Sequence, residues 1–145
     1  MPGEKSTAFS GQLLGLIFNG TTIASIAQNA TSSPYTNFYV SFHTADPGAG
    51  GNQTTNEVSY TSYARTAVPR STGGFAVSGA TVTFASNVIA PTPTGSATQT
   101  ATNFAIGTAS TGAGEILYTG PINPPITITI GQPPTLTTAT TITEG

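Results

Sequence analysis

Short runs of β-branched residues, each closed by glycine or proline, constrain the fold of this chain more than any other feature of its sequence. Threonine supplies 29 of the 145 residues, and β-branched side chains lose little freedom in an extended backbone. Glycine and proline, with 17 and 11 copies, end most runs before they reach helical length. The pattern predicts about seven to nine short strands.

We expect these strands to form an all-β fold, an antiparallel β-sandwich or jelly roll with a short N-terminal helix and extended terminal arms. A length of 145 residues fits a single domain. Its expected parts are a helix and arm over 1–20, a sandwich core over 35–130 and a C-terminal strand and arm over 131–145. For the segment 21–37 the sequence allows two structures, an irregular strand or a second short helix.

The clearest strand runs from Phe38 to Thr44 and ends at the turn sequence Asp46-Pro47-Gly48. The segment 49–59 after the turn is polar and rich in glycine, so we expect an exposed loop. A return strand is predicted from Tyr60 to Val68, because aromatic and β-branched residues recur there.

The N-terminal helix is predicted from apolar residues at helical spacing. Ser6 or Thr7 can cap its start, and Asn19-Gly20 can end it. The apolar face comprises Phe9, Leu13, Leu16 and Ile17. Gly11 and Gly15 each lower the intrinsic stability of the helix by about 1 kcal/mol relative to alanine, so it needs contacts with the rest of the fold or with a partner.

Further strands follow from alternation of apolar and polar residues. Segments 75–77 and 80–85 form a predicted hairpin, and the strand 98–108 is paired with 115–119, which Gly120-Pro121 closes. Ile126, Ile128 and Ile130 are expected on one buried face of a further strand. The threonine-rich segment 136–143 has no proline or lysine to guard it, so we expect it to add to the sheet of a neighbour.

Several of these segments resemble a family of small virion proteins of tailed bacteriophages. The closest stretch is Tyr39–Gly48, followed by Glu57-Val58 and Tyr63-Ala64-Arg65; Ala105–Ala109 and Glu115–Gly120 are similar in order and character. Members of this family are often labelled tail-fibre proteins, and some are capsid decoration proteins. The resemblance implies a protein of the virion. The first residues show no basic segment followed by a long apolar run, so we expect synthesis in the host cytoplasm.

Charge and composition argue against several classes of partner. The chain has eight charged residues and a net charge of −2, without the basic cluster that binds a phosphate backbone, so no nucleic acid partner is expected. The run Leu13–Phe18 is too short to cross a membrane. A surface with so little charge suits a protein fixed in an assembly.

No catalytic, cofactor-binding or metal site is predicted. His43 and Asp46 lie three residues apart, but two ligands are too few for a transition metal and the chain has no cysteine. His43 is expected to pack and hydrogen bond, and Asp46 to cap its own turn. Arg65 is expected to pair with Glu57 or Asp46 across the base of the loop.

The leading functional hypothesis is a capsid decoration, or cement, protein on the outer capsid surface. Its partners are then the major capsid protein, copies of itself in a dimer or trimer, or both, with the terminal arms as clasps. The candidate partner-binding residues are Tyr60, Tyr63, Arg65, Phe9, Leu13, Leu136 and Ile142.

Two alternatives remain. One is a tail-fibre or baseplate component that binds a host receptor through the loop 48–56. The other is a carbohydrate-binding module with an exposed aromatic platform, for which the candidates are Tyr35, Tyr39, Tyr60 and Tyr63.

Overall fold

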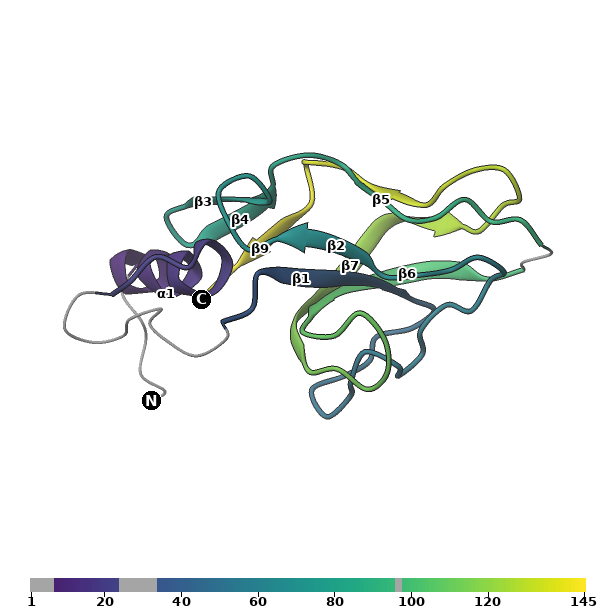
Figure 1. Cartoon of the computed structure of the whole chain (residues 1–145), viewed down its shortest axis with the longest axis horizontal. Coiled ribbons are helices and arrows are strands. Elements are labelled where there is room, and N and C mark those ends of the chain that lie inside the picture. Colours follow the sequence, from purple (N-terminus) through teal and green to yellow (C-terminus); the bar gives the residue numbers. More distant parts are fainter. Residues whose placement is uncertain (1–6, 24–33, 96–97) are drawn as a thin grey trace. The chain divides into compact units, whose positions relative to one another are not determined.

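The computed structural model describes residues 7–23, 34–95 and 98–145 (Figure 1). These ranges contain one helix and nine strands. The possible cap at Ser6 lies outside these ranges, and so do residues 24–33 of the segment 21–37, for which the sequence allows two structures. The elements are α1 (Thr7–Asn19), β1 (Asn37–His43), β2 (Thr66–Pro69), β3 (Phe75–Ser78), β4 (Thr81–Phe84), β5 (Val88–Ile89), β6 (Thr100–Gly107), β7 (Ile116–Thr127), β8 (Thr135–Leu136) and β9 (Thr141–Thr143).

The fold is mostly β with one N-terminal helix, as the sequence predicts. The strands form three sheets, in the orders β2-β1-β6-β7, β3-β4-β9 and β5-β8. The pairs β1–β6, β6–β7, β3–β4, β4–β9 and β5–β8 are all antiparallel. None of the described sheets closes into a barrel, and the sandwich or jelly-roll arrangement stays a prediction.

The chain divides into two compact units. The helix unit comprises Met1–Thr36, Pro69–Asn87 and Thr137–Gly145, and the sheet unit comprises Asn37–Val68 and Val88–Leu136. The chain therefore passes from one unit to the other four times. The expectation of a single domain over 1–145 stays a prediction.

The centre of the sheet unit is the pairing of β1 with β6. Val40 lies opposite Ile106 and Phe42 opposite Phe104, and all four side chains are buried. The residues of β6 from Phe104 to Gly107 are buried without interruption, so this end of the strand is covered on both faces. The predicted strands over 38–44 and 98–108 are thus confirmed, with the apolar core where alternation placed it.

β7 departs from the prediction. It continues from Ile116 through Gly120 and Pro121 to Thr127, although we expected this dipeptide to end the strand. Its register against β6 shifts between Ala101 and Asn103, and such an irregularity lets an edge strand accommodate proline. The shared face of Ile126, Ile128 and Ile130 is wrong in part, because Ile128 is buried but Ile130 is 56% exposed.

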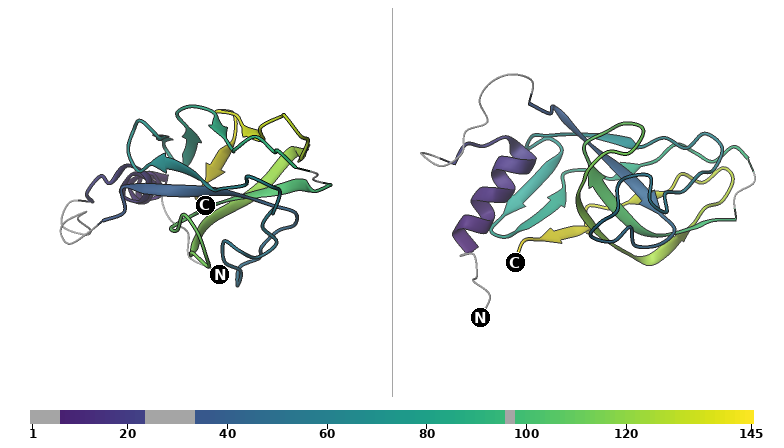
Figure 2. Two further views of the ribbon diagram at one scale, coloured as in Figure 1. Left: turned by 45° about the vertical axis from the view of Figure 1, so that its right-hand side comes forward. Right: turned by 90° about the horizontal axis from the view of Figure 1, so that it is seen from below.

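In the helix unit, α1 packs against the β3–β4 hairpin (Figure 2). The helix spans the predicted residues and ends before Gly20, whose positive φ of 66° suits a helix terminus. The predicted apolar face is not the most buried one. Ser10, Leu14 and Phe18 are the buried residues, whereas Phe9, Leu13, Leu16 and Ile17 are half-buried.

The two faces differ because the helix is apolar on more than one side, and only contact with the hairpin selects between them. The Phe18 ring lies 4.7 Å from that of Phe75, which in turn lies 5.7 Å from Phe84. A Cβ atom at Gly11 would stand 2.5 Å from the carbonyl oxygen of Gly79. The absence of a side chain at Gly11 therefore lets the helix approach the hairpin turn closely.

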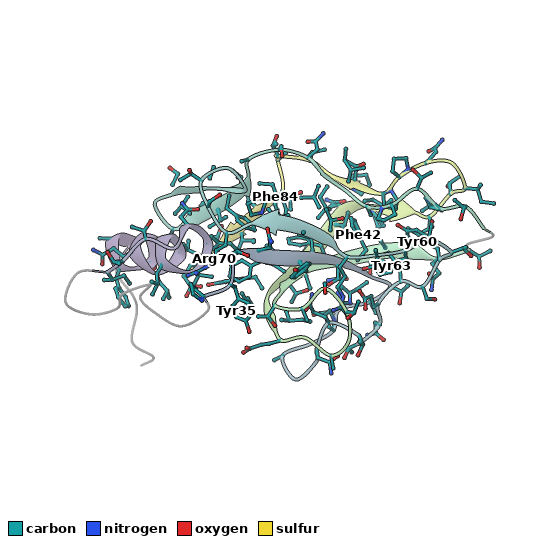
Figure 3. All side chains as sticks on the ribbon, viewed as in Figure 1. Tyr35, Phe42, Tyr60, Tyr63, Arg70 and Phe84 are labelled. Carbon is teal, nitrogen blue, oxygen red and sulfur yellow. The ribbon has the colours of Figure 1, made fainter. Side chains whose placement is uncertain are left out.

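Arg70 ties the end of the helix to the rest of the helix unit. Its guanidinium donates hydrogen bonds to the carbonyl oxygens of Leu16, Ile17 and Tyr35, and Figure 3 shows its place beside Tyr35. The last carbonyls of a helix lack partners within the helix, so a cation there is favourable.

The C-terminal segment is built into sheets of its own chain. Leu136 in β8 pairs with Val88, and Ile142 in β9 pairs with Val82. Both Leu136 and Ile142 are buried. The prediction of an extended C-terminal arm is therefore wrong for residues 135–136 and 141–143, which pair within the fold. The expectation that this segment adds to the sheet of a neighbour stays a prediction.

Candidate functional site

The loop that leaves β1 is closed by backbone hydrogen bonds. The amide of Thr44 donates to the carbonyl of Asn56 at 2.7 Å, and the amide of Val58 donates to that of Phe42 at 3.0 Å. The loop follows the strand and much of it is exposed, as predicted, but not all of its residues face outward. Gln53 is completely buried and Val58 is 2% exposed, so the loop has a core of its own.

Gln53 is the centre of that core. Its amide nitrogen donates to the carbonyl of Tyr39 at 3.2 Å, and its amide oxygen accepts from the backbone of Ala109 at 2.9 Å. A Cβ atom at Gly107 or Gly114 would lie within 2.2 Å of this side chain. The two glycines therefore make the space in which Gln53 joins the loop to residues 108–115.

His43 anchors the loop from the end of β1. Its Nδ1 lies 2.8 Å from the carbonyl oxygen of Thr55, and its Nε2 lies 2.9 Å from the Ser41 hydroxyl. Because a carbonyl only accepts, Nδ1 carries the proton and Ser41 donates to Nε2. Burial lowers the pKa of His43, which favours the neutral ring. The prediction of a packed, hydrogen-bonded histidine is confirmed.

Two short turns shape the rest of the loop. The carboxylate of Asp46 accepts a hydrogen bond from the amide of Gly48 at 2.9 Å, as predicted for this residue. The Asn52 side chain accepts from both the amide and the hydroxyl of Thr54. Such local bonds fix the backbone without a strand or helix.

Arg65 and Glu57 form the ion pair that the sequence predicts. The guanidinium meets the carboxylate with two hydrogen bonds, Nε to Oε1 at 2.7 Å and Nη2 to Oε2 at 2.8 Å. Its remaining donors reach the carbonyls of Ala109 at 2.9 Å and Gly112 at 2.8 Å. The side chain of Arg65 is 3% exposed, and its bonds to Glu57 raise the pKa of the guanidinium. One buried cation thus holds two loops together.

Two tyrosines complete this cluster. The hydroxyl of Tyr63 donates to Glu57 at 2.8 Å and accepts from the amide of Phe42 at 3.2 Å. The Tyr60 ring packs edge-on against Tyr63 at 5.2 Å (Figure 3), and its hydroxyl donates to the carbonyl of Pro91 at 2.7 Å. Burial raises the pKa of Tyr60 to about 12, and that of Tyr63 is raised for the same reason.

The predicted return strand over 60–68 is wrong in its first half. Only Thr66–Pro69 forms β2, because Tyr60, Tyr63 and Arg65 turn their polar groups to the loops. Ser62 has a positive φ of 77°, which no regular strand accommodates.

We call residues 44–58 and 108–115 the loop platform, since side chains of the sheet unit hold these two loops side by side (Figure 1). Its outward residues are small or polar. The exposed ones are Thr44, Ala45, Asp46, Gly48, Ala49, Gly50, Thr54, Asn56, Ser110, Thr111, Gly112, Ala113 and Glu115. The platform therefore offers a polar surface of low charge on a fixed backbone.

The structure brings together three of the seven predicted partner-binding residues, Tyr60, Tyr63 and Arg65, beneath the platform. The other four lie elsewhere: Phe9 and Leu13 are half-buried on α1, and Leu136 and Ile142 are buried in β8 and β9. A contact of any of them with a partner stays a prediction. The burial of Gln53 was not predicted from the sequence. The feature that comes nearest to indicating it is the pair of glycines at 107 and 114, which face its side chain.

Metal sites and membrane spans can be assessed for the described part of the chain. Within it, no three side chains of histidine, cysteine, aspartate or glutamate come close enough to hold a metal ion. No helix among residues 7–23, 34–95 and 98–145 has the length and apolar character to cross a membrane.

Comparison with known proteins gives one finding on identity. No curated protein matches the sequence. The family model described as "Podophage GP4 fiber I protein gp80" matches residues 5–143, almost the whole chain, and this family is one of structural proteins rather than of enzymes. The resemblance to phage virion proteins is thereby confirmed. The chain belongs to the Podophage GP4 fiber I protein gp80 family and is a fiber-type structural component of the virion.

Proposed function

We propose that this protein is a tail-fibre component whose loop platform contacts the receptor on the host surface. The family description supports a fiber position. The observation that carries the role of the platform is its buried polar support, in which Gln53 and Arg65 hold two outward loops. A surface ordered before binding loses less conformational entropy when a ligand arrives.

The chemistry of the platform suits recognition by hydrogen bonds. Its exposed side chains are hydroxyls, amides and small residues, with Asp46 and Glu115 as carboxylates. Backbone groups of Gly48, Gly50 and Gly112 lie at its surface without side chains to cover them. A polar surface of low charge binds through directed hydrogen bonds more than through long-range attraction.

The capsid decoration hypothesis has less support. It relied on terminal arms as clasps, and residues 135–136 and 141–143 are paired within the chain. The aromatic platform of a carbohydrate-binding module is also weakened at two of its four candidates. Tyr60 is 5% exposed and the hydroxyl of Tyr63 is used internally.

The first test counts copies per virion by quantitative mass spectrometry of purified particles. A tail-fibre component is expected at a small fraction of the copy number of the major capsid protein. Near-equal copy numbers of the two proteins would contradict a fibre position.

The second test uses a steric block. A side chain at Gly50 meets no atom within 4 Å of its Cβ, so Gly50→Trp places a large ring on the platform without disturbing the fold. Purified wild-type chain should compete with phage for adsorption to host cells, and the Gly50→Trp variant should not. The matched control is Gly73→Trp in the helix unit, where a Cβ makes only an ordinary contact at 3.5 Å. Equal competition by both variants would show that the loop platform does not contact the receptor.

A further inference from the structure

Among the residues that the structure describes, strand β9 has no partner strand on one of its two sides. It is the last strand of the order β3-β4-β9 and pairs with β4 along its other side (Figure 2). Exposed sheet edges usually carry proline, a charge or a cover that prevents pairing with another chain. The sequence of β9, Thr141-Ile142-Thr143, has neither proline nor charge.

The outer strands of the larger described sheets are guarded. β2 ends in Pro69, and β3 packs against helix α1. The edge strand β7 contains Pro121, Pro124 and Pro125 and shifts its register against β6. Among the outer strands of the described three- and four-stranded sheets, β9 is therefore the one without a proline or a covering helix.

The hydrogen bonding of β4 and β9 determines which groups face outward. The amide of Glu144 donates to the carbonyl of Ala80 at 2.8 Å, and Val82 lies opposite Ile142. Because hydrogen-bonded and non-hydrogen-bonded pairs alternate, Ile142 bonds to β4. The N–H and C=O groups of Thr141 and Thr143 consequently point away from β4, toward the open side.

We propose that β9 pairs antiparallel with β9 of a second copy of this chain, about a two-fold axis at Ile142. Thr141 then lies opposite the partner's Thr143, and the two residues exchange both backbone hydrogen bonds. The two-fold axis repeats this pair, so Thr143 lies opposite Thr141 of the second copy. Ile142 lies opposite Ile142 of the second copy. The two three-stranded sheets become one sheet of six strands.

A second copy fits this edge for two reasons. The sequence Thr-Ile-Thr reads the same in both directions, as an isologous pairing of strands requires. Thr141 and Thr143 are exposed while Ile142 is buried, so threonine would meet threonine across the new pair and isoleucine would extend the apolar face. The low net charge of −2 opposes self-association only weakly.

Sedimentation equilibrium of the full chain tests the proposal. The wild type should form a reversible dimer, and the double variant Thr141→Pro, Thr143→Pro should be monomeric, because proline removes the outward N–H groups but leaves those that bond to β4. The variant Thr141→Lys, Thr143→Lys should also be monomeric through charge repulsion, and it covers the case that the proline variant does not fold.

The matched control is Thr72→Lys, Thr111→Lys, which adds the same charge at two exposed threonines outside β9, and it should remain dimeric. A monomeric or trimeric wild type would overturn the proposal, and so would a dimer that persists in a folded edge variant.

Cysteine cross-linking locates the axis. The natural sequence has no cysteine, so a single substitution gives one thiol per chain. Across a non-hydrogen-bonded antiparallel pair the Cα atoms lie about 4.5 Å apart, within the range of a disulfide. Oxidation should convert Ile142→Cys into a covalent dimer and leave Thr72→Cys without a covalent cross-link. Equal dimer formation by both variants, or none by Ile142→Cys, would exclude an axis at Ile142.

Discussion

The loop platform and the helix unit are held together by different kinds of contact. Buried polar groups with exact partners fix the platform, with Gln53 and Arg65 at its centre. In the helix unit, α1 packs on the hairpin through Leu14, Phe18 and Phe75. Apolar contacts tolerate changes of shape and are lost by degrees, whereas a buried polar group that loses its partner carries the whole cost of desolvation. The platform should therefore respond more sharply than the helix unit to conservative substitutions.

The largest expected effect comes from breaking the ion pair under the platform. Arg65→Met keeps much of the side-chain volume but leaves the carboxylate of Glu57 without its cation, and such losses cost about 3–5 kcal/mol of the free energy of unfolding. Denaturant unfolding measures it. In the helix unit, Leu14→Met is the matched change and should cost less than about 1.5 kcal/mol. Equal losses in the two variants would contradict the contrast between the regions.

The next effect concerns Gln53. Gln53→Leu keeps the size of the side chain but leaves the amide of Ala109 and the carbonyl of Tyr39 without their partner, at a cost of about 1–3 kcal/mol. Hydrogen exchange should show lost protection at Ala109, while residues of α1 keep theirs. Unchanged protection at Ala109 would mean that Gln53 does not hold the second loop.

Two glycines of the same helix should respond in opposite directions. Gly11→Ala brings a Cβ atom to 2.5 Å from the carbonyl of Gly79 and should destabilise the protein by about 1–3 kcal/mol, as overpacking does. Gly15→Ala meets Thr21 at an ordinary 3.8 Å and should add up to about 1 kcal/mol through helix propensity. Thermal unfolding of the two variants measures the difference. A gain in stability from Gly11→Ala would refute the close approach of helix and hairpin.

The smallest effect is a dependence on pH that belongs to the platform. Burial lowers the pKa of His43 from its ordinary value of 6.5, so the unfolded chain binds a proton more readily than the folded one. His43 thus contributes stability above about pH 6.5, which is lost as the pH falls through the lowered pKa. Glu57, Arg65 and Asp46 are the charged groups around the ring.

His43→Asn keeps a donor for the carbonyl of Thr55 and cannot gain a charge. The melting temperature of the wild type should fall more than that of His43→Asn between pH 7 and pH 5. Parallel profiles would show that His43 does not sense pH.

The helix and the main strands could be predicted because they depend on patterns within short segments. Phe38–Thr44 and Val82–Phe84 alternate as strands must, and Asn19-Gly20 marks a helix end. Which face of α1 is buried could not be predicted, since apolar residues surround the helix and the hairpin chooses among them. The continuation of β7 through Gly120-Pro121 depends on the register of β6, which no local pattern records.

Of the contacts that hold the loop platform, only the ion pair between two charged residues near one loop could be predicted. Arg65 and Glu57 are eight residues apart in a chain with few charges, so their pairing could be foreseen. The burial of Gln53 depends on Gly107 and Gly114, which lie more than fifty residues further along. A polar residue in a polar loop carries no sign of such a distant contact.

The four passages of the chain between its units affect how a gene of this kind can evolve. No single crossover point separates the coding sequence for one unit from that for the other, so a single recombination event between related phages would always combine parts of the helix unit from two parents. Exchange of a short stretch such as residues 44–58 lies within one unit and disturbs neither boundary. Under the proposed receptor-binding role, variation in host range would arise by replacing this one loop and retaining the rest of the reading frame.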